Sequence, residues 1–117
     1  GIGCVKLNPE LGQAFMFRDR SLEANALNDL FKDQLKIFDK MVRAKLIESQ
    51  TDTASIKKNF DYGGEVLLGH LRYGTSGSFS QRSCHPYLRR SNWTTRNLMV
   101  CGNFNMTNTA ELNDTLI

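Results

Sequence analysis

One segment of the chain combines a cation with hydroxyl groups and flexible backbone. Residues 69–77 read Gly-His-Leu-Arg-Tyr-Gly-Thr-Ser-Gly, and Arg72 lies where an apolar strand pattern gives way to a loop. Side chains alternate along a strand, so His70 and Arg72 are expected on one face, together with Leu68 and Val66. A guanidinium beside hydroxyls and backbone amides can bind a carboxylate or a phosphate. The alternative that the pattern leaves open is a solvated arginine followed by an ordinary loop.

A second segment places polar side chains between a strand and a helix start. Residues 101–108 read Cys-Gly-Asn-Phe-Asn-Met-Thr-Asn, after a short apolar run. Asn108 can cap a helix, with Glu111 at the spacing of a capping box. Side-chain amides and helix N-termini offer donors for an oxyanion or a phosphate. Turn and cap chemistry, which asparagine and threonine favour, is the alternative here.

The cysteines and histidines do not form a pattern of their own. Cys84 and His85 are adjacent, and neighbours in an extended segment point to opposite faces, so we do not expect a nucleophile–base pair. Cys4 and Cys101 lie in apolar strand patterns typical of buried structural thiols. No CxxC pair occurs, which leaves no zinc signature. Reduced thiols in a cytoplasmic protein are the expectation.

The charge of the chain is distributed unevenly. The 117 residues carry a net charge of +3, with 40% hydrophobic and 23% charged residues, which fits a globular domain. No apolar run is long enough to span a membrane. Residues 66–110 contain arginine but no lysine and no acid. This acid-free stretch, with Arg72, Arg82, Arg89, Arg90 and Arg96, indicates an anionic ligand.

The first half of the chain predicts a hairpin followed by helix. Residues 2–7 and 13–18 read as two strands joined by an Asn-Pro-Glu-Leu-Gly turn. Ser21 can cap a helix, and apolar residues then recur at steps of three and four over 22–48 as a core-facing stripe. One long helix and two helices meeting near Asp39 are both compatible with this spacing.

The second half predicts short strands that are covered on both faces. Residues 49–63 read as a surface connection with a helical turn at 55–58. The runs 65–73 and 97–101 are nearly continuous in apolar residues, which is typical of buried strands. Residues 74–83 read as a loop. A short last helix that has begun by residue 117, and a start without a leader, lead us to expect a piece of a larger protein.

Together the motifs resemble a known family. The segments GHLRYGTSG (69–77), HPY (85–87) and CGNFNMTNTAEL (101–112) are similar to the glutaminase domain of class II glutamine amidotransferases, and most similar to amidophosphoribosyltransferases. Residues 65–117 carry the specific match, and the opening hairpin fits the family's sheet. Residues 1–117 are then an internal fragment of that domain, with 22–62 a helical insertion.

The resemblance implies an α+β fold and an amide-hydrolysing activity. The fold is the N-terminal-nucleophile hydrolase αββα sandwich with antiparallel sheets, of which this chain would be a part. An N-terminal cysteine attacks the side-chain amide of glutamine, and a synthase domain uses the ammonia, here with phosphoribosyl pyrophosphate in purine biosynthesis. No cofactor is implied for this part. Glutamine and the rest of the parent chain are the expected partners, with no nucleic acid and no membrane.

Site residues carry over from the resemblance one by one. Arg72 matches the arginine that holds the glutamine α-carboxylate, and Thr75 lies in the loop lining that pocket. Asn103 matches the oxyanion-hole asparagine, and the backbone N–H of Phe104 follows it in the same loop. His85 matches a histidine of the related sugar-phosphate amidotransferases and is assigned to substrate binding.

The chain also departs from the family pattern. Phe104 replaces the usual glycine, Gly102 replaces the usual histidine, and no residue matches the N-terminal cysteine, so the chain alone is expected to be inactive. A degenerate glutamine-sensing or scaffold domain is the alternative that Phe104 favours. Nucleic-acid binding by the arginines is a third reading, although a backbone-binding patch normally includes lysines. The oligomeric state is open, and exposed strand edges of a partial sandwich are one route to homo-oligomers.

Overall fold

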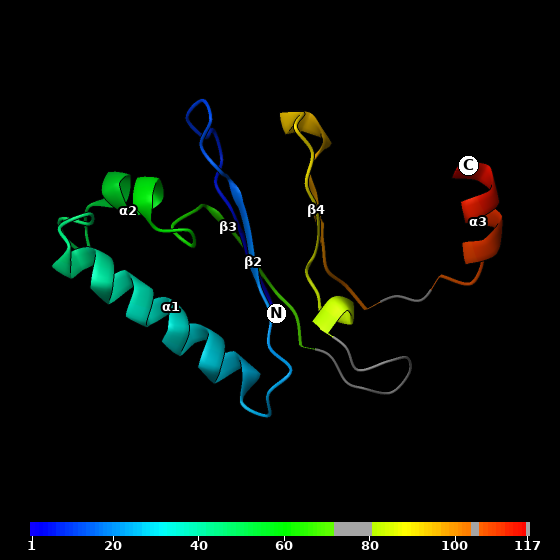
Figure 1. Ribbon diagram of the computed structural model, residues 1–117, viewed down its shortest axis with the longest axis horizontal. Coiled ribbons are helices and arrows are strands. Elements are labelled where there is room, and N and C mark those ends of the chain that lie inside the picture. The colour runs from blue at the N-terminus through cyan, green and yellow to red at the C-terminus, as the bar shows by residue number, and fades with distance from the viewer. Residues whose placement is uncertain (72–80, 104–105, 117) are drawn as a thin grey trace.

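The computed structural model describes residues 1–71, 81–103 and 106–116, and its first half forms a three-stranded antiparallel sheet (Figure 1). The order is β2-β1-β3, with β1 at Ile2–Val5, β2 at Met16–Asp19 and β3 at Val66–Gly69. Cys4 of β1 lies opposite Phe17 on one side and Leu67 on the other. The predicted hairpin is confirmed, and Gly12 supplies the positive φ, at 79°, in its turn.

A second, two-stranded sheet follows. It pairs β4 (Tyr87–Arg89) with β5 (Leu98–Val100) in antiparallel register. The connection contains the short 3₁₀ turn Thr94–Arg96 and is held by Asn97. The Asn97 Oδ1 accepts from the Ser91 N–H at 2.8 Å, and its Nδ2 donates to the carbonyls of Trp93 and Thr94. One half-buried amide side chain therefore satisfies three backbone groups of the turn.

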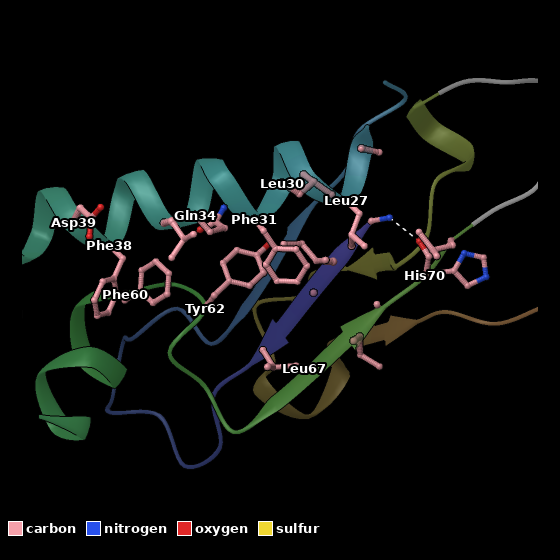
Figure 2. A pocket seen from close by; sticks show the side chains of 18 of the residues that line it. Leu27, Leu30, Phe31, Gln34, Phe38, Asp39, Phe60, Tyr62, Leu67 and His70 are labelled. Carbon is pink, nitrogen blue, oxygen red and sulfur yellow. Dashed lines mark hydrogen bonds between the residues drawn. The ribbon is translucent and has the colours of Figure 1, made fainter. Parts of the chain in front are cut away.

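The two sheets pack on each other through Gly3. A Cβ at this position would lie 2.5 Å from the Met99 sulfur and 3.1 Å from the Pro86 ring, so β1 faces the β4–β5 hairpin there. Because side chains alternate, Ile2 and Cys4 point to the other face, over which the first helix lies (Figures 1 and 2). The layers are thus helix, three-stranded sheet and two-stranded sheet, which confirms the α+β class with small antiparallel sheets.

The helical stretch forms one helix, which decides between the two alternatives that the spacing left open, and there is no break near Asp39. Helix α1 runs from Ala26 to Arg43 without interruption, since its apolar steps continue and no glycine or proline interrupts them. It ends where Lys45 adopts a φ of 60° and Leu46 donates its N–H to the Met41 carbonyl.

The cap expected at Ser21 is also wrong. Asn25 occupies the N-cap position of α1 and makes no side-chain cap hydrogen bond. The Ser21 hydroxyl instead accepts from the Glu23 N–H at 3.2 Å, within the turn before the helix. A serine at the end of a strand can satisfy a local turn as readily as a helix end, which the sequence pattern alone does not separate.

The remaining helices follow the sequence pattern more closely. The predicted turn at 55–58 is helix α2 (Thr53–Asn59), whose N-cap Asp52 accepts from the Ser55 N–H at 3.3 Å. Helix α3 (Thr109–Leu116) follows Asn108 as expected and lies on the far side of the hairpin from α1 (Figure 1). Within the predicted loop 74–83, the described part Gln81–Ser83 is a 3₁₀ turn.

The expectation that the apolar strands are covered on both faces is wrong. Leu67 of β3 is 67% exposed, and Leu98 of β5 is 56% exposed. The predicted core stripe of α1 is likewise mostly exposed, and only Leu30 on it is buried. For β3 and α1, the reason is an open apolar cavity of about 980 Å³ between α1 and the β1–β3 side of the sheet, lined by Leu27, Phe31, Leu35, Phe38 and Leu67, among others (Figure 2).

The buried core is therefore small, and Leu30 is one of its few large members. We expect Leu30→Ala to lower the free energy of unfolding by about 2–5 kcal/mol, because it removes a buried side chain and leaves a cavity. Leu35→Ala is the matched control on the same helix, and since Leu35 is 61% exposed its effect should stay within about 0.5 kcal/mol. Urea unfolding followed by circular dichroism measures both, and equal effects would contradict the assigned burial.

An ion pair ties helix α2 to the sheet and makes stability depend on pH. The Lys57 ammonium lies 2.5 Å from the Glu65 carboxylate, which also accepts from the Leu7 N–H at 2.8 Å. These two donors lower the pKa of Glu65 from 4.5 to about 2, with the Lys57 bond the larger cause. The folded state therefore prefers the ionised carboxylate, so the stabilisation is present above about pH 4.5 and is lost as the pH falls toward 2.

We expect Glu65→Gln to destabilise the chain near neutral pH and to have a vanishing effect as the pH approaches 2. Urea midpoints of the two proteins over this pH range measure the difference. Both side chains are substantially exposed, so added salt should reduce the difference at neutral pH. A difference between the variants that persists unchanged at acid pH excludes this origin.

Candidate functional site

Two histidines far apart in the sequence are stacked in the structure. The rings of His70 and His85 lie 4.2 Å apart with an interplanar angle of 17°. His70 directly follows β3, and His85 directly precedes Pro86 and β4. The pair therefore lies where the two sheets meet, and it joins the start of the 69–77 motif to the start of the second sheet.

The same joint includes the third motif. The Gly102 N–H donates to Nδ1 of His85 at 3.1 Å, and the Tyr87 ring packs on His85 at 4.4 Å. Asn103, the next residue after Gly102, is exposed. The structure thus brings together the segments around residues 70, 85 and 102. A site built from the 69–77 and 101–112 motifs requires this proximity.

Gly1, which immediately precedes β1, also reaches this joint. Gly1 and His70 exchange both backbone hydrogen bonds, with the Gly1 ammonium 2.9 Å from the His70 carbonyl oxygen and the His70 N–H 3.0 Å from the Gly1 oxygen. Burial lowers the pKa of the Gly1 amine, against a partial opposing effect of Asp19 and the neighbouring thiols. His70 is thus held by backbone pairing on one side and by the His85 ring on the other.

Several predicted site residues lie outside the described residues. Arg72 and Thr75 fall within 72–80, and Phe104 falls within 104–105. Arg72 is one residue beyond Leu71, and Phe104 is one residue beyond Asn103, so the described chain reaches both motifs at their edges.

The surroundings of the cysteines do not favour a nucleophilic thiolate at Cys4 and show no disulfide. Cys4 is fully buried and points toward α1, and burial raises the pKa of its thiol. A thiol in that environment is a poor nucleophile, since the thiolate is the reactive form. Cys101 is half-buried and not fully buried as predicted, because β5 lies at an open edge of its sheet. Neither of them, nor Cys84, forms a disulfide.

Two buried polar atoms were not indicated by the sequence. The Tyr62 hydroxyl and Nδ1 of His70 lack hydrogen-bond partners among the described residues. Burial raises the pKa of the Tyr62 phenol well above its ordinary value, and the ring lies beside Phe60 under α1 (Figure 2). Strand alternation placed His70 on the correct face, but no sequence signal pointed to His85 as its partner.

The described part of the chain shows neither a metal site nor a membrane-crossing helix. Within residues 1–71, 81–103 and 106–116, no three His, Cys, Asp or Glu side chains are grouped to hold a metal ion. No helix in these ranges has the length and apolar character needed to cross a bilayer. Comparison with protein-family models, with curated proteins and with solved structures finds no match to this chain.

Proposed function

We propose that this chain is the glutamine-binding part of a class II glutamine amidotransferase. The observation that supports the proposal is the joint of His70, His85 and Gly102, because it brings the 69–77 and 101–112 motifs to one place. These are the segments whose resemblance assigns the α-carboxylate clamp and the oxyanion donor.

The layer order also supports the proposal. A three-stranded and a two-stranded antiparallel sheet pack on each other, as the two central layers of an αββα sandwich do. The N-terminal-nucleophile hydrolase fold is therefore part of the proposal, with residues 22–62, which contain α1 and α2, as a helical insertion in it.

The proposed reaction is hydrolysis of the glutamine side-chain amide. Arg72 holds the α-carboxylate of glutamine in a pocket lined by Thr75, and the Asn103 amide with the Phe104 N–H stabilises the oxyanion that forms when a thiolate attacks. The proposed nucleophile is an N-terminal cysteine outside these 117 residues, since Cys4 is buried and points toward α1, away from the joint of His70 and His85. The ammonia released passes to a synthase domain, with phosphoribosyl pyrophosphate as acceptor.

Arg72 tests the assignment of the carboxylate clamp. In the longer parent protein, we expect Arg72→Ala to raise the KM for glutamine roughly 10²-fold, because it leaves the substrate carboxylate without its charged partner. Arg82→Ala is the matched control, since Arg82 is an exposed arginine of the same acid-free stretch. Steady-state ammonia release measures both, and an active protein whose KM is unmoved by Arg72→Ala removes Arg72 from the site.

Asn103 tests the assignment of the oxyanion donor. We expect Asn103→Ala to lower kcat for glutamine hydrolysis by about 10²–10³ with a smaller change in KM, because the lost donor acts on the transition state. Asn108→Ala, at the start of α3, is the control with the same chemical change. Equal effects of the two variants would argue against an oxyanion hole at Asn103.

Two measurements on the longer parent protein distinguish a catalytic amidotransferase from a glutamine-sensing domain. Calorimetry that detects glutamine binding without release of ammonia favours a degenerate sensor, which the substitution of the usual glycine by Phe104 would explain. Ammonia release that depends on Asn103 favours the amidotransferase.

A further inference from the structure

The His85 side chain contacts three separate segments of the chain. It is 8% exposed, its ring lies between His70 and Tyr87, and its Nδ1 accepts from the Gly102 N–H at 3.1 Å. These partners come from the end of β3, from β4 and from the residue that precedes Asn103. One imidazole thus connects the two sheets and the segment that carries the proposed oxyanion donor.

The hydrogen bond defines the protonation state of this ring. A backbone N–H can only donate, so Nδ1 of His85 must carry a free lone pair. The ring is therefore neutral with its proton on Nε2. A protonated ring would place a second donor opposite the Gly102 N–H, and the bond would be lost.

We infer that His85 is a positioning residue that fixes residues 101–103 against the end of β3. A ring packed between two other rings, with Nδ1 already bonded to the backbone, is better suited to hold a segment than to contact glutamine. The effect on catalysis rests on the proposed function, because it acts through Asn103. The positioning of residues 101–103 by His85 does not rest on the proposed function, since it concerns only contacts among the described residues.

Protonation of His85 at Nδ1 would release Gly102 and loosen this joint. Among the described residues, titratable and charged groups near the imidazole come from several segments. His70 and Tyr87 contact the ring, and Arg18 donates to the Pro86 carbonyl at 3.2 Å. The Gly1 ammonium, paired with His70, is influenced in turn by Asp19, Arg20, Cys84 and Cys101. The hydrogen bond from the Gly102 N–H should therefore be lost as the pH falls and Nδ1 of His85 becomes protonated. This pH dependence should disappear when the ring is replaced by a group that does not titrate.

The first experiment uses the 117-residue chain. We expect ¹⁵N NMR to show Nδ1 of His85 unprotonated, and the Gly102 amide to exchange with a protection factor that falls roughly 10-fold between about pH 7.5 and about pH 5. His85→Asn offers an amide oxygen at the same place without titrating, so its protection should be retained at both pH values. His85→Leu has similar bulk and no acceptor, and it should lose the protection at both.

These results can overturn the inference without any activity. A protonated Nδ1 at neutral pH, or a Gly102 protection factor that depends on pH in the same way in wild type and His85→Asn, removes the proposed role. If His85→Leu does not fold, the wild-type tautomer and the His85→Asn comparison still decide the question.

The second experiment uses the longer parent protein. We expect His85→Leu to lower kcat for glutamine hydrolysis roughly 10-fold with KM changed much less, and His85→Asn to restore most of the loss. If Asn103→Ala lowers kcat but His85→Leu keeps the full wild-type kcat, the proposed effect of His85 on catalysis is overturned. A wild-type parent without glutaminase activity overturns the proposed function instead, and the positioning role is then decided by the Gly102 amide.

Discussion

The pairing of β1 on both of its edges is the constraint on which the other layers depend. Its register with β2 and β3 sets Cys4 opposite Phe17 and Leu67. Because the side chains of a strand alternate, this register directs Cys4 toward α1 and Gly3 toward the β4–β5 hairpin. A slip of one residue would exchange the two faces and put a side chain where Met99 and Pro86 now approach the backbone.

The joint between the sheets follows from that pairing. Gly1 and His70 extend the β1–β3 ladder by one further pair of hydrogen bonds, and this places the His70 ring on the face that meets the hairpin. His85 lies at the start of the hairpin and so meets His70 ring to ring. The segment at 101–103 then follows from β5, whose partner β4 begins two residues after His85. The position of Asn103 is therefore a consequence of strand register in two sheets.

The helix layer is held by fewer contacts than the sheets. Of the large apolar side chains on α1, Leu30 is buried, whereas Phe31 and Leu35 line the open cavity together with Leu67 from the sheet. The edge-to-face pair of Phe38 and Phe60, with ring centroids 5.3 Å apart, lies at one end of that cavity (Figure 2). A core of this size places much of the burial energy on a few side chains, among them Ile2, Cys4, Leu30 and Ile47.

The sequence by itself determined the local elements of this protein. Alternation and turn chemistry located the opening hairpin, helical spacing located α1, and the position of Asn108 located the start of α3, because each depends on residues close together in the chain. Only the tertiary structure decided how exposed β3 and β5 are, which residue occupies the N-cap of α1 and which ring stacks on His70. An apolar run looks the same whether it faces a packed layer or an open cavity, and no periodicity links residue 70 to residues 85 and 102. The motifs and their resemblance only predicted which residues would bind glutamine, whereas the packing of the two sheets at Gly3 brings His70, His85 and Gly102 together.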